Sequence, residues 1–157
     1  MKRMLLYIVI LSLSLLAPVK ASDIGKLLPV QVVSIYRMNE QIVMETDTEN
    51  RGFGETAQQA LQNLKDTASG MIYLDTAQYL LLSEDTKSCV EELLGELKDS
   101  VKLCQIEKRV DLTETARYLS VRDGLPTLKQ WRNDRNLPVL SDFENSSTFL
   151  KKVEKRA

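Results

Sequence analysis

Two glycines, Gly52 and Gly54 in the stretch NRGFGET, stand directly ahead of an amphipathic run. Glycines before a helix N-terminus can leave backbone N–H groups free to bind a phosphate. The spacing fits neither GxxxxGK[ST] nor GxGxxG, and Glu55 would repel an anion at this bend. In the structural interpretation, which we favour, the glycines give the backbone conformational freedom, Thr56 caps the helix and Gln59 completes a capping box.

The chain of 157 residues contains no histidine. Ser-His-Asp catalysis, Cys-His catalysis and histidine-containing zinc sites are therefore excluded. Neither an SxxK nor a GxSxG pattern occurs, and for Asp75, between two apolar runs, a turn or cap role is favoured over a catalytic one. We expect a protein that is not an enzyme, with no cofactor and no metal, and keep a histidine-free hydrolase as a minor alternative.

Charge is distributed unevenly, with 6 basic and 14 acidic residues over 22–100 against 12 basic and 8 acidic residues over 101–157. A basic half could face an anionic partner such as lipid head groups or wall polymer, but the explanation we favour is that solvated helix faces differ by chance. Trp131 suits a membrane interface if it is exposed, and a core anchor if it packs with Leu128. The residues predicted to contact an anionic surface are Trp131, Arg132, Arg135, Lys151, Lys152, Lys155 and Arg156.

The N-terminus has the pattern of a secretory signal peptide over 1–21. Lys2 and Arg3 precede an apolar block over 4–16, and small residues lead to Ala21, after which we expect cleavage. The block is shorter than the roughly 20 residues of a spanning helix, with an uncleaved anchor as the alternative. No cysteine follows the block, so the lipobox of a lipoprotein is missing. The sequence predicts a secreted or extracytoplasmic protein.

Two cysteines, Cys89 and Cys104, remain in this exported chain and are candidates for a disulfide. A helix over 85–98 followed by a strand from 101 would carry the chain out by about 15 Å and back by a similar distance, so the sulfur atoms could meet. Two buried thiols that act as small hydrophobic groups are the alternative. The sequence leaves both possibilities open.

Alternating and apolar runs predict the elements of a sheet. Residues 29–38 and 41–48 predict a hairpin with its turn at Asn39 and Glu40, and 77–82 predicts a central strand buried on both faces. A short extended piece over 71–74 precedes that strand, and another strand begins near 101.

Helical periodicity appears between these strands and after them. Helices are predicted behind the Thr56 cap, over 85–98 and over 111–124, and a short fourth helix surrounds Leu128 and Trp131. The predicted fold is α/β (α+β), a mixed sheet of about four strands in the order ββαβαβ with helices packed on it and a C-terminal helical segment. The predicted domains are a signal peptide over 1–21, one globular domain over 22–140, and a basic tail or short helix over 141–157.

The stretch over 28–110 resembles the N-terminal domain of the Ger(x)C lipoproteins, the C subunits of spore nutrient-germinant receptors. The likeness lies in the order of features: the hairpin VQVVSIYRMNEQIVMETDT, then GFGETAQQALQNLKDTASGMIYLDTAQYLLLSED, then CVEELLGELKDSVKLCQIEKRV. The lipid-bearing cysteine of that family is absent here. The resemblance implies a binding scaffold in a Gram-positive, spore-forming bacterium and carries over no catalytic residue.

These observations lead to two hypotheses about function. In the first, the chain is an exported, non-enzymatic binding module that contacts protein partners at the outer face of the membrane. In the second, it is an envelope-surface module whose basic C-terminal half binds anionic lipid or wall polymer. We expect no nucleic-acid partner in either case.

Overall fold

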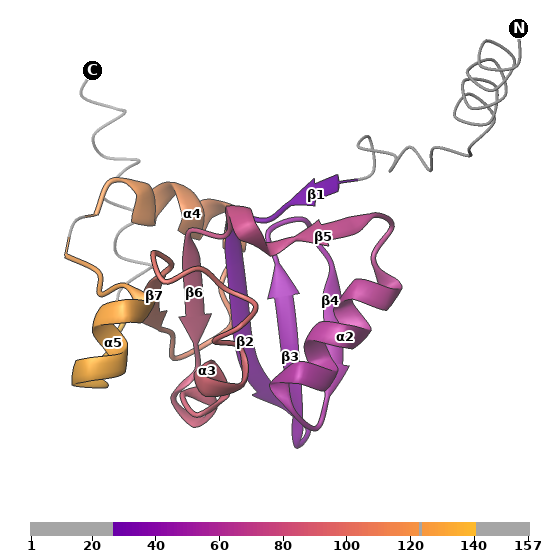
Figure 1. Cartoon of the computed structure of the whole chain (residues 1–157), viewed down its shortest axis with the longest axis horizontal. Coiled ribbons are helices and arrows are strands. Elements are labelled where there is room, and N and C mark those ends of the chain that lie inside the picture. Colours follow the sequence, from indigo (N-terminus) through magenta and orange to yellow (C-terminus); the bar gives the residue numbers. More distant parts are fainter. Residues whose placement is uncertain (1–26, 123, 141–157) are drawn as a thin grey trace, which may run out of the picture.

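The structure is a computed structural model that describes residues 27–122 and 124–140 (Figure 1). A five-stranded sheet has the order β4-β3-β2-β6-β7, and a separate parallel pair joins β1 to β5. The predicted mixed α/β class is confirmed, with one strand more than expected because the glycine-containing bend is itself a strand, β4. The strands are β1 (Leu27–Pro29), β2 (Val32–Met38), β3 (Gln41–Thr46), β4 (Arg51–Gly54), β5 (Met71–Tyr73), β6 (Tyr79–Leu82) and β7 (Lys102–Gln105).

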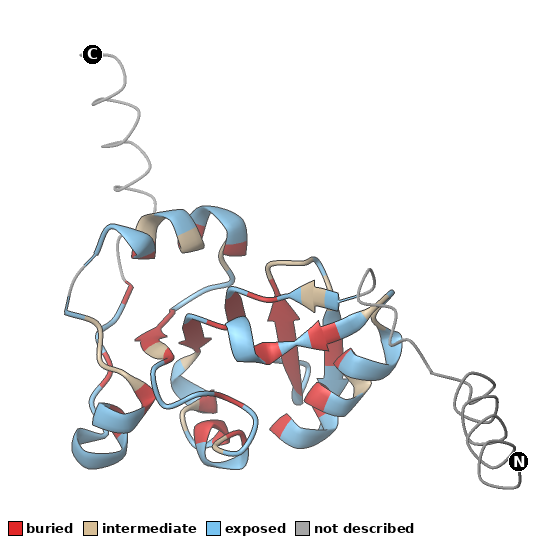
Figure 2. Ribbon diagram, turned by 45° about the horizontal axis from the view of Figure 1, so that its top comes forward, coloured by how far each residue is buried: buried red, intermediate tan, exposed pale blue. Residues whose placement is uncertain are grey.

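Helices cover both faces of the five-stranded sheet. They are α2 (Ala57–Thr67), α3 (Cys89–Glu92), α4 (Leu112–Ser120) and α5 (Leu128–Asp134), with 3₁₀ turns η2 (Leu74–Thr76) and η3 (Glu84–Thr86). On what we call the front face, α2, α3 and α5 pack on a large apolar cluster that includes Ile35, Met44 and Leu80. On the back face, α4 packs on a smaller cluster that includes Val32 and Leu81. Figure 2 shows the buried strands between helices whose outer sides are exposed.

The β2–β3 hairpin turns at Asn39 and Glu40, as predicted. Both residues have positive φ, 49° and 67°, which is the conformation of a type I′ turn. The antiparallel register pairs Ser34 with Glu45 and Tyr36 with Val43. Because side chains alternate between the faces of a strand, Ser34, Tyr36, Val43 and Glu45 all lie on the back face.

Strand β6 is buried along its whole length, as the apolar run predicts. It lies parallel to β2 on one side and to β7 on the other. The central strand, however, is β2 rather than β6, because β3 and β4 extend the sheet beyond β2. The prediction that the run over 77–82 forms the central strand was therefore wrong by one position.

Helix α2 lies directly on the backbone of β4. A Cβ atom at Gly52 would come within 2.0 Å of the Ala60 carbonyl oxygen, and one at Gly54 within 2.5 Å of the Ala60 nitrogen. The two glycines therefore permit close helix–strand contact, whereas the sequence suggested only a relaxed backbone. Thr56 caps α2 by accepting a hydrogen bond from the Gln59 N–H, as predicted. The predicted capping box is not completed, because the Gln59 side chain accepts from the Glu55 N–H and not from the N–H of Thr56.

Strands β1 and β2 are separated by a break after Pro29. The predicted strand over 29–38 therefore begins only at Val32, and residues 27–29 pair with β5 instead. The Asp47 carboxylate accepts hydrogen bonds from the backbone N–H groups of Gln31 and Val32 and so satisfies the backbone at the break.

The predicted helix over 85–98 is wrong in its length. Only η3 and the four residues of α3 are helical in this segment. The Thr86 hydroxyl, which is fully buried, donates to the Ile35 carbonyl and ties the segment to the end of β2. Gly95, which lowers helix propensity, follows soon after α3.

The segment after β7 forms the two further helices that the sequence predicts. Asp111 caps α4 by accepting from the Glu114 N–H, and Thr127 and Gln130 make a capping box at α5. Between and after these helices, residues 126–128 and 138–140 exchange backbone hydrogen bonds with the outer edge of β7. On the opposite edge of the sheet, the Asn63 and Thr67 side chains of α2 bond the backbone of β4 at Phe53 and Arg51.

Candidate functional site

Glu45 is a charged side chain buried in the back face of the sheet, with 7% of its surface exposed. Arg51 on the neighbouring strand β4 donates to its Oε1 atom over 2.8 Å. Arg109, from the segment after β7, makes two bonds, from Nη2 to Oε1 at 2.7 Å and from Nε to Oε2 at 3.0 Å. The Tyr36 hydroxyl donates to Oε2 at 3.2 Å. Four donors from three parts of the chain therefore converge on one carboxylate.

The arginines of this cluster keep the Glu45 carboxyl in its ionised form. Burial by itself would raise the pKa of the Glu45 carboxyl, but hydrogen bonds from Arg109 and Arg51 outweigh it and hold that pKa below its usual value. Burial, and then the Glu45 carboxylate, raise the pKa of Tyr36. Glu45 is therefore ionised at neutral pH. Because its oxygens already accept four hydrogen bonds, it is poorly suited to taking a proton from a substrate and instead fixes the 107–111 segment to the sheet.

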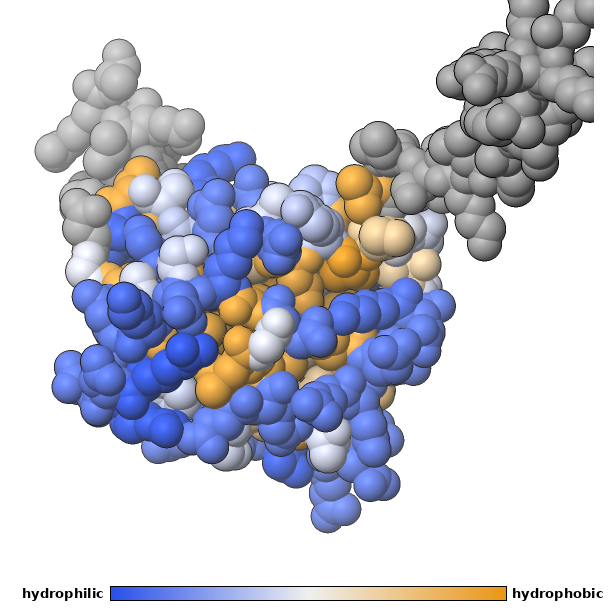
Figure 3. Space-filling model, viewed as in Figure 1, coloured by the Kyte–Doolittle hydropathy of each residue, from blue (hydrophilic) through white to orange (hydrophobic). Residues whose placement is uncertain are grey.

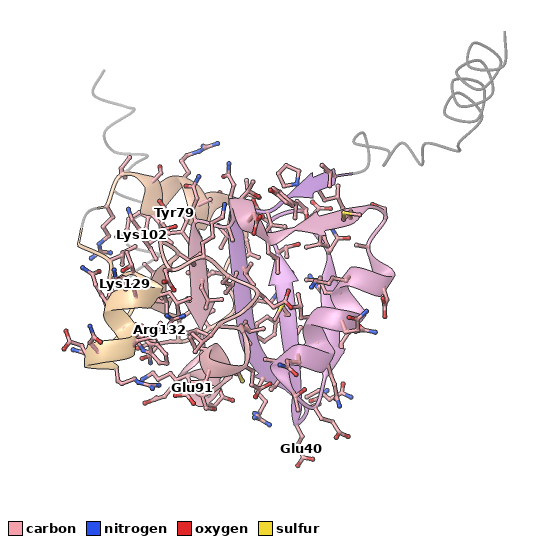
Figure 4. The ribbon with its side chains drawn as sticks, in the orientation of Figure 1. Glu40, Tyr79, Glu91, Lys102, Lys129 and Arg132 are labelled. Atoms are coloured by element: carbon pink, nitrogen blue, oxygen red, sulfur yellow. The ribbon has the colours of Figure 1, made fainter. Side chains whose placement is uncertain are left out.

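Beside this cluster, the back of the hairpin carries large side chains that none of the described helices covers. Phe53 is 41% exposed and Met38 is 47% exposed, while Tyr36 is partly buried. Phe53 pairs with Val43, which in turn pairs with Tyr36, so the three residues form one row across the strands. We call Tyr36, Met38, Arg51 and Phe53 together the hairpin face. Glu40 marks the tip of the hairpin in Figure 4.

A pocket of about 360 Å³ lies next to the cluster, between the end of β3 and the start of α4. Its lining includes Glu45, Asp47, Glu49 and Asp111, but only two basic residues, Arg51 and Arg109. Both guanidinium groups bond Glu45. Four acidic residues against two basic ones make the lining of this pocket net negative and unsuited to an anion, and we assign it no ligand.

A second crevice, of about 490 Å³, lies at the carboxyl ends of β6 and β7, where ligands bind in many α/β sheets. Glu84, Asp85 and Glu107 line it. Asp85 already accepts from the Ser83 hydroxyl and pairs with Arg37 at 3.5 Å. Over residues 27–122 and 124–140, no group of three or more Asp, Glu, Cys or His side chains is placed to hold a metal ion.

Among the residues predicted to contact an anionic surface, the structure buries Trp131 and places Arg132 and Arg135 in ion pairs. Trp131 is only 3% exposed and packs in the front cluster, so it is a core anchor and does not contact an anionic surface. Arg132 pairs with Asp99 at 3.0 Å, and Arg135 pairs with Glu91 and stacks on the Trp131 ring. These arginines on α5 thus meet acidic residues of the 84–100 segment, on the side where Figure 4 labels Arg132 and Glu91.

The candidate disulfide between Cys89 and Cys104 is not formed in the structure, where both cysteines are free. Cys89 lies in the front cluster and Cys104 in the back cluster, so the sheet separates them. The geometric argument relied on a long helix that the structure replaces with a single turn. The alternative of two buried thiols holds, and burial raises the pKa of Cys104 to about 11.

No family model, curated protein or solved structure matches this chain. The resemblance to the Ger(x)C proteins therefore stays a prediction.

Several predictions concern residues outside the described part of the chain. These are the signal peptide over 1–21, the tail over 141–157, and the basic residues Lys151, Lys152, Lys155 and Arg156 within it. Over residues 27–122 and 124–140, none of the helices has the length and apolar character needed to span a bilayer.

The buried ion cluster was not predicted from the sequence. The alternation over 41–48 placed Glu45 on the same side as Val43, which was a signal that one face of β3 carries charge. Nothing in the sequence indicated that Arg109, 64 positions further along, would reach that carboxylate. A long-range contact of this kind depends on the parallel crossover that sets β7 beside β6.

Proposed function

We propose that this chain is an exported, non-enzymatic binding module that contacts a protein partner at the outer face of a membrane. The observation that supports this most is the hairpin face, where Phe53 and Met38 stay exposed beside Arg51. Export is proposed from the signal-like N-terminal sequence. A relationship to the spore germination receptor subunits belongs to the same proposal.

The composition of the hairpin face suits a protein partner. Tyrosine, phenylalanine, methionine and arginine are enriched in protein interfaces, and most binding energy comes from a few such side chains. The face also sits on a rigid base, because β2, β3 and β4 are held by the hairpin register and Glu45 fixes the neighbouring segment. A preorganised aromatic surface loses little entropy when a partner binds.

A second candidate function is an envelope-surface module that binds anionic lipid or wall polymer through its basic C-terminal half. It is supported by the excess of basic over acidic residues after position 100. The ion pairs of Arg132 and Arg135 with acidic partners reduce the charge available on α5. Binding of this kind would weaken as salt increases and would depend on Lys151, Lys152, Lys155 and Arg156.

Site-specific photo-crosslinking in the producing cells tests the proposal. One variant carries a photoreactive side chain in place of Phe53, and its control carries the same side chain in place of Val139. The two positions are 41% and 42% exposed, so a difference in crosslinking does not arise from accessibility. We expect a discrete protein adduct from position 53 and none from position 139. Equal adducts from both positions, or none from either, would contradict the proposal.

A further inference from the structure

The β1–β5 pair presents a small apolar surface of its own. The parallel register sets Leu27 beside Met71 and Pro29 beside Tyr73. Because side chains alternate along a strand, these four residues share one side, which we call the β1–β5 face. Met71 is 64% exposed, Tyr73 41% and Leu27 37%. On the other side of the pair, Leu28 and Ile72 pack on the front cluster.

Figure 3 shows some hydrophobic residues where β1 and β5 lie in Figure 1, above a larger hydrophobic area over the middle of the molecule. The edges of the large sheet are occupied by α2 on one side and by residues 126–128 and 138–140 on the other. The hairpin face adjoins charged residues, whereas the β1–β5 face consists of leucine, proline, methionine and tyrosine. The two surfaces therefore differ in the kind of partner that they suit.

We infer that the β1–β5 face rests on the lipid bilayer, with Leu27, Met71 and Tyr73 at the level of the lipid head groups. This inference rests on the proposed location at the outer face of a membrane, and it assigns the lipid contact to a surface other than the basic C-terminal half.

The path of the chain favours lipid over other occupants. Strand β1 is the first described element after the apolar block over 4–16, and ten residues separate the end of that block from Leu27. Ten extended residues span at most roughly 35 Å. In the uncleaved-anchor alternative, in which the block is retained in the membrane, β1 therefore lies within that distance of the bilayer, and the inference applies to this form of the chain. Tyrosine is enriched where protein meets the bilayer interface, because its ring is apolar and its hydroxyl is polar.

Charge around the face indicates which lipids it would accept. The Asp75 carboxylate raises the pKa of the Tyr73 hydroxyl, so the charge identified beside the face among the described residues is negative. Contact with an anionic bilayer would bring this carboxylate towards like charge, whereas zwitterionic lipid imposes no such cost. We therefore expect contact with phosphatidylcholine bilayers that persists at high salt. The second candidate function predicts the opposite dependence on both lipid charge and salt.

Fluorescent labels on the full chain in phosphatidylcholine vesicles test the inference. Met71→Cys and, as its control, Val121→Cys each receive one environment-sensitive label. Val121 is another exposed apolar residue, with 78% exposure, at the end of α4. The native Cys89 and Cys104 are buried and do not compete for the label in the folded protein. Tyr73→Cys provides a second labelled position on the β1–β5 face.

We expect the labels at positions 71 and 73 to shift to shorter wavelength and to be quenched by lipids that carry nitroxides near the head groups. The label at position 121 stays in water. The inference is overturned if the chain floats with the vesicles while labels at 71 and 73 remain in water. It is also overturned if their shift requires no vesicles and grows with protein concentration, which would identify a second copy as the occupant. The crosslinking at Phe53 reports separately on the protein partner, so either proposal can fail without the other.

Discussion

The two faces of the sheet are covered in different ways. The front face has a continuous apolar cluster under α2, α3 and α5, and on it α2 approaches β4 closely enough to require glycine at two positions. The back face has α4 over one end, and at the other end a buried carboxylate bonded by two arginines beside exposed Phe53 and Met38. The front face therefore supplies most of the apolar packing, and the back face leaves large side chains exposed.

The difference originates in the alternation along β2, β3 and β4. Ile35, Met44 and Gly52 point forwards in one row, while their neighbours Ser34, Glu45 and Arg51 point backwards in another. An apolar row can be covered by a helix without any cost from buried polar groups. Charged side chains must either stay near water or find partners. Here the buried Glu45 is paired, and its partner Arg51 stays partly exposed.

The largest expected effect comes from adding a methyl group to the front face. Gly52→Ala would place its Cβ atom 2.0 Å from a backbone oxygen and 2.5 Å from the Leu64 nitrogen, so α2 must move away from β4. We expect the free energy of unfolding to fall by about 3 kcal/mol, measured by urea denaturation.

Gly95→Ala is the matched control for this substitution. Nothing lies within 4 Å of the Cβ position there, so we expect the free energy of unfolding to rise by about 0.5 kcal/mol. Similar effects at the two glycines would show that close helix contact is not what distinguishes the front face.

A smaller effect is expected from Glu45→Gln on the back face. The side chains of Arg51 and Arg109 keep 45% and 52% of their surface exposed, so water can solvate them once the carboxylate is lost. We therefore expect a loss of about 2 kcal/mol at neutral pH, less than for a fully buried pair. Glu40→Gln, at the exposed hairpin tip, is the control and should change stability by less than about 0.5 kcal/mol.

The pH dependence of this difference gives a sharper test of the ion cluster. The pKa of Glu45 is lower in the folded protein than in the unfolded chain, where a glutamate has a pKa of about 4.3. Its contribution is therefore fully present above that value and is lost as the pH falls through the lower folded pKa. We expect the wild-type protein and Glu45→Gln to converge in urea midpoint on acidification. A constant difference would mean that Glu45 stabilises the fold by packing alone.

The smallest expected effect concerns the two thiols, one on each face. Because Cys89 and Cys104 are free and buried, adding a reducing agent should leave the melting temperature unchanged. Burial raises the pKa of both thiols, so a thiol-specific reagent should react only when the protein unfolds. A melting temperature that drops when the reducing agent is added would show that Cys89 and Cys104 do form a disulfide.

Local patterns in the sequence were enough to predict most of the secondary structure. The Asn39-Glu40 turn, the Thr56 and Asp111 caps and the buried run of β6 depend on neighbouring residues, and each appears in the structure. The length of the helix after residue 85 could not be predicted, because the Thr86 hydroxyl bonds a carbonyl 51 positions away.

The candidate site was harder to predict than the fold for the same reason. Phe53 was part of an expected loop, and its exposure on the back of a strand became evident only once β4 paired with β3. Arg109 lies in a charged stretch after the predicted strand, and its neighbours in the sequence do not indicate that it bonds Glu45. Surfaces assembled from distant segments depend on strand order, which no short window of sequence encodes.

The blocked edges of the large sheet have a consequence for the protein's behaviour at high concentration. An open strand edge is a template on which other chains can add, and such addition is a common route to fibrils. Here the Asn63 and Thr67 side chains bond the free backbone of β4, and the chain's own later segments pair with β7. Both edges of the folded five-stranded sheet are thereby closed to further strands, so the protein should stay dispersed at concentrations where an open edge would recruit unfolded neighbours.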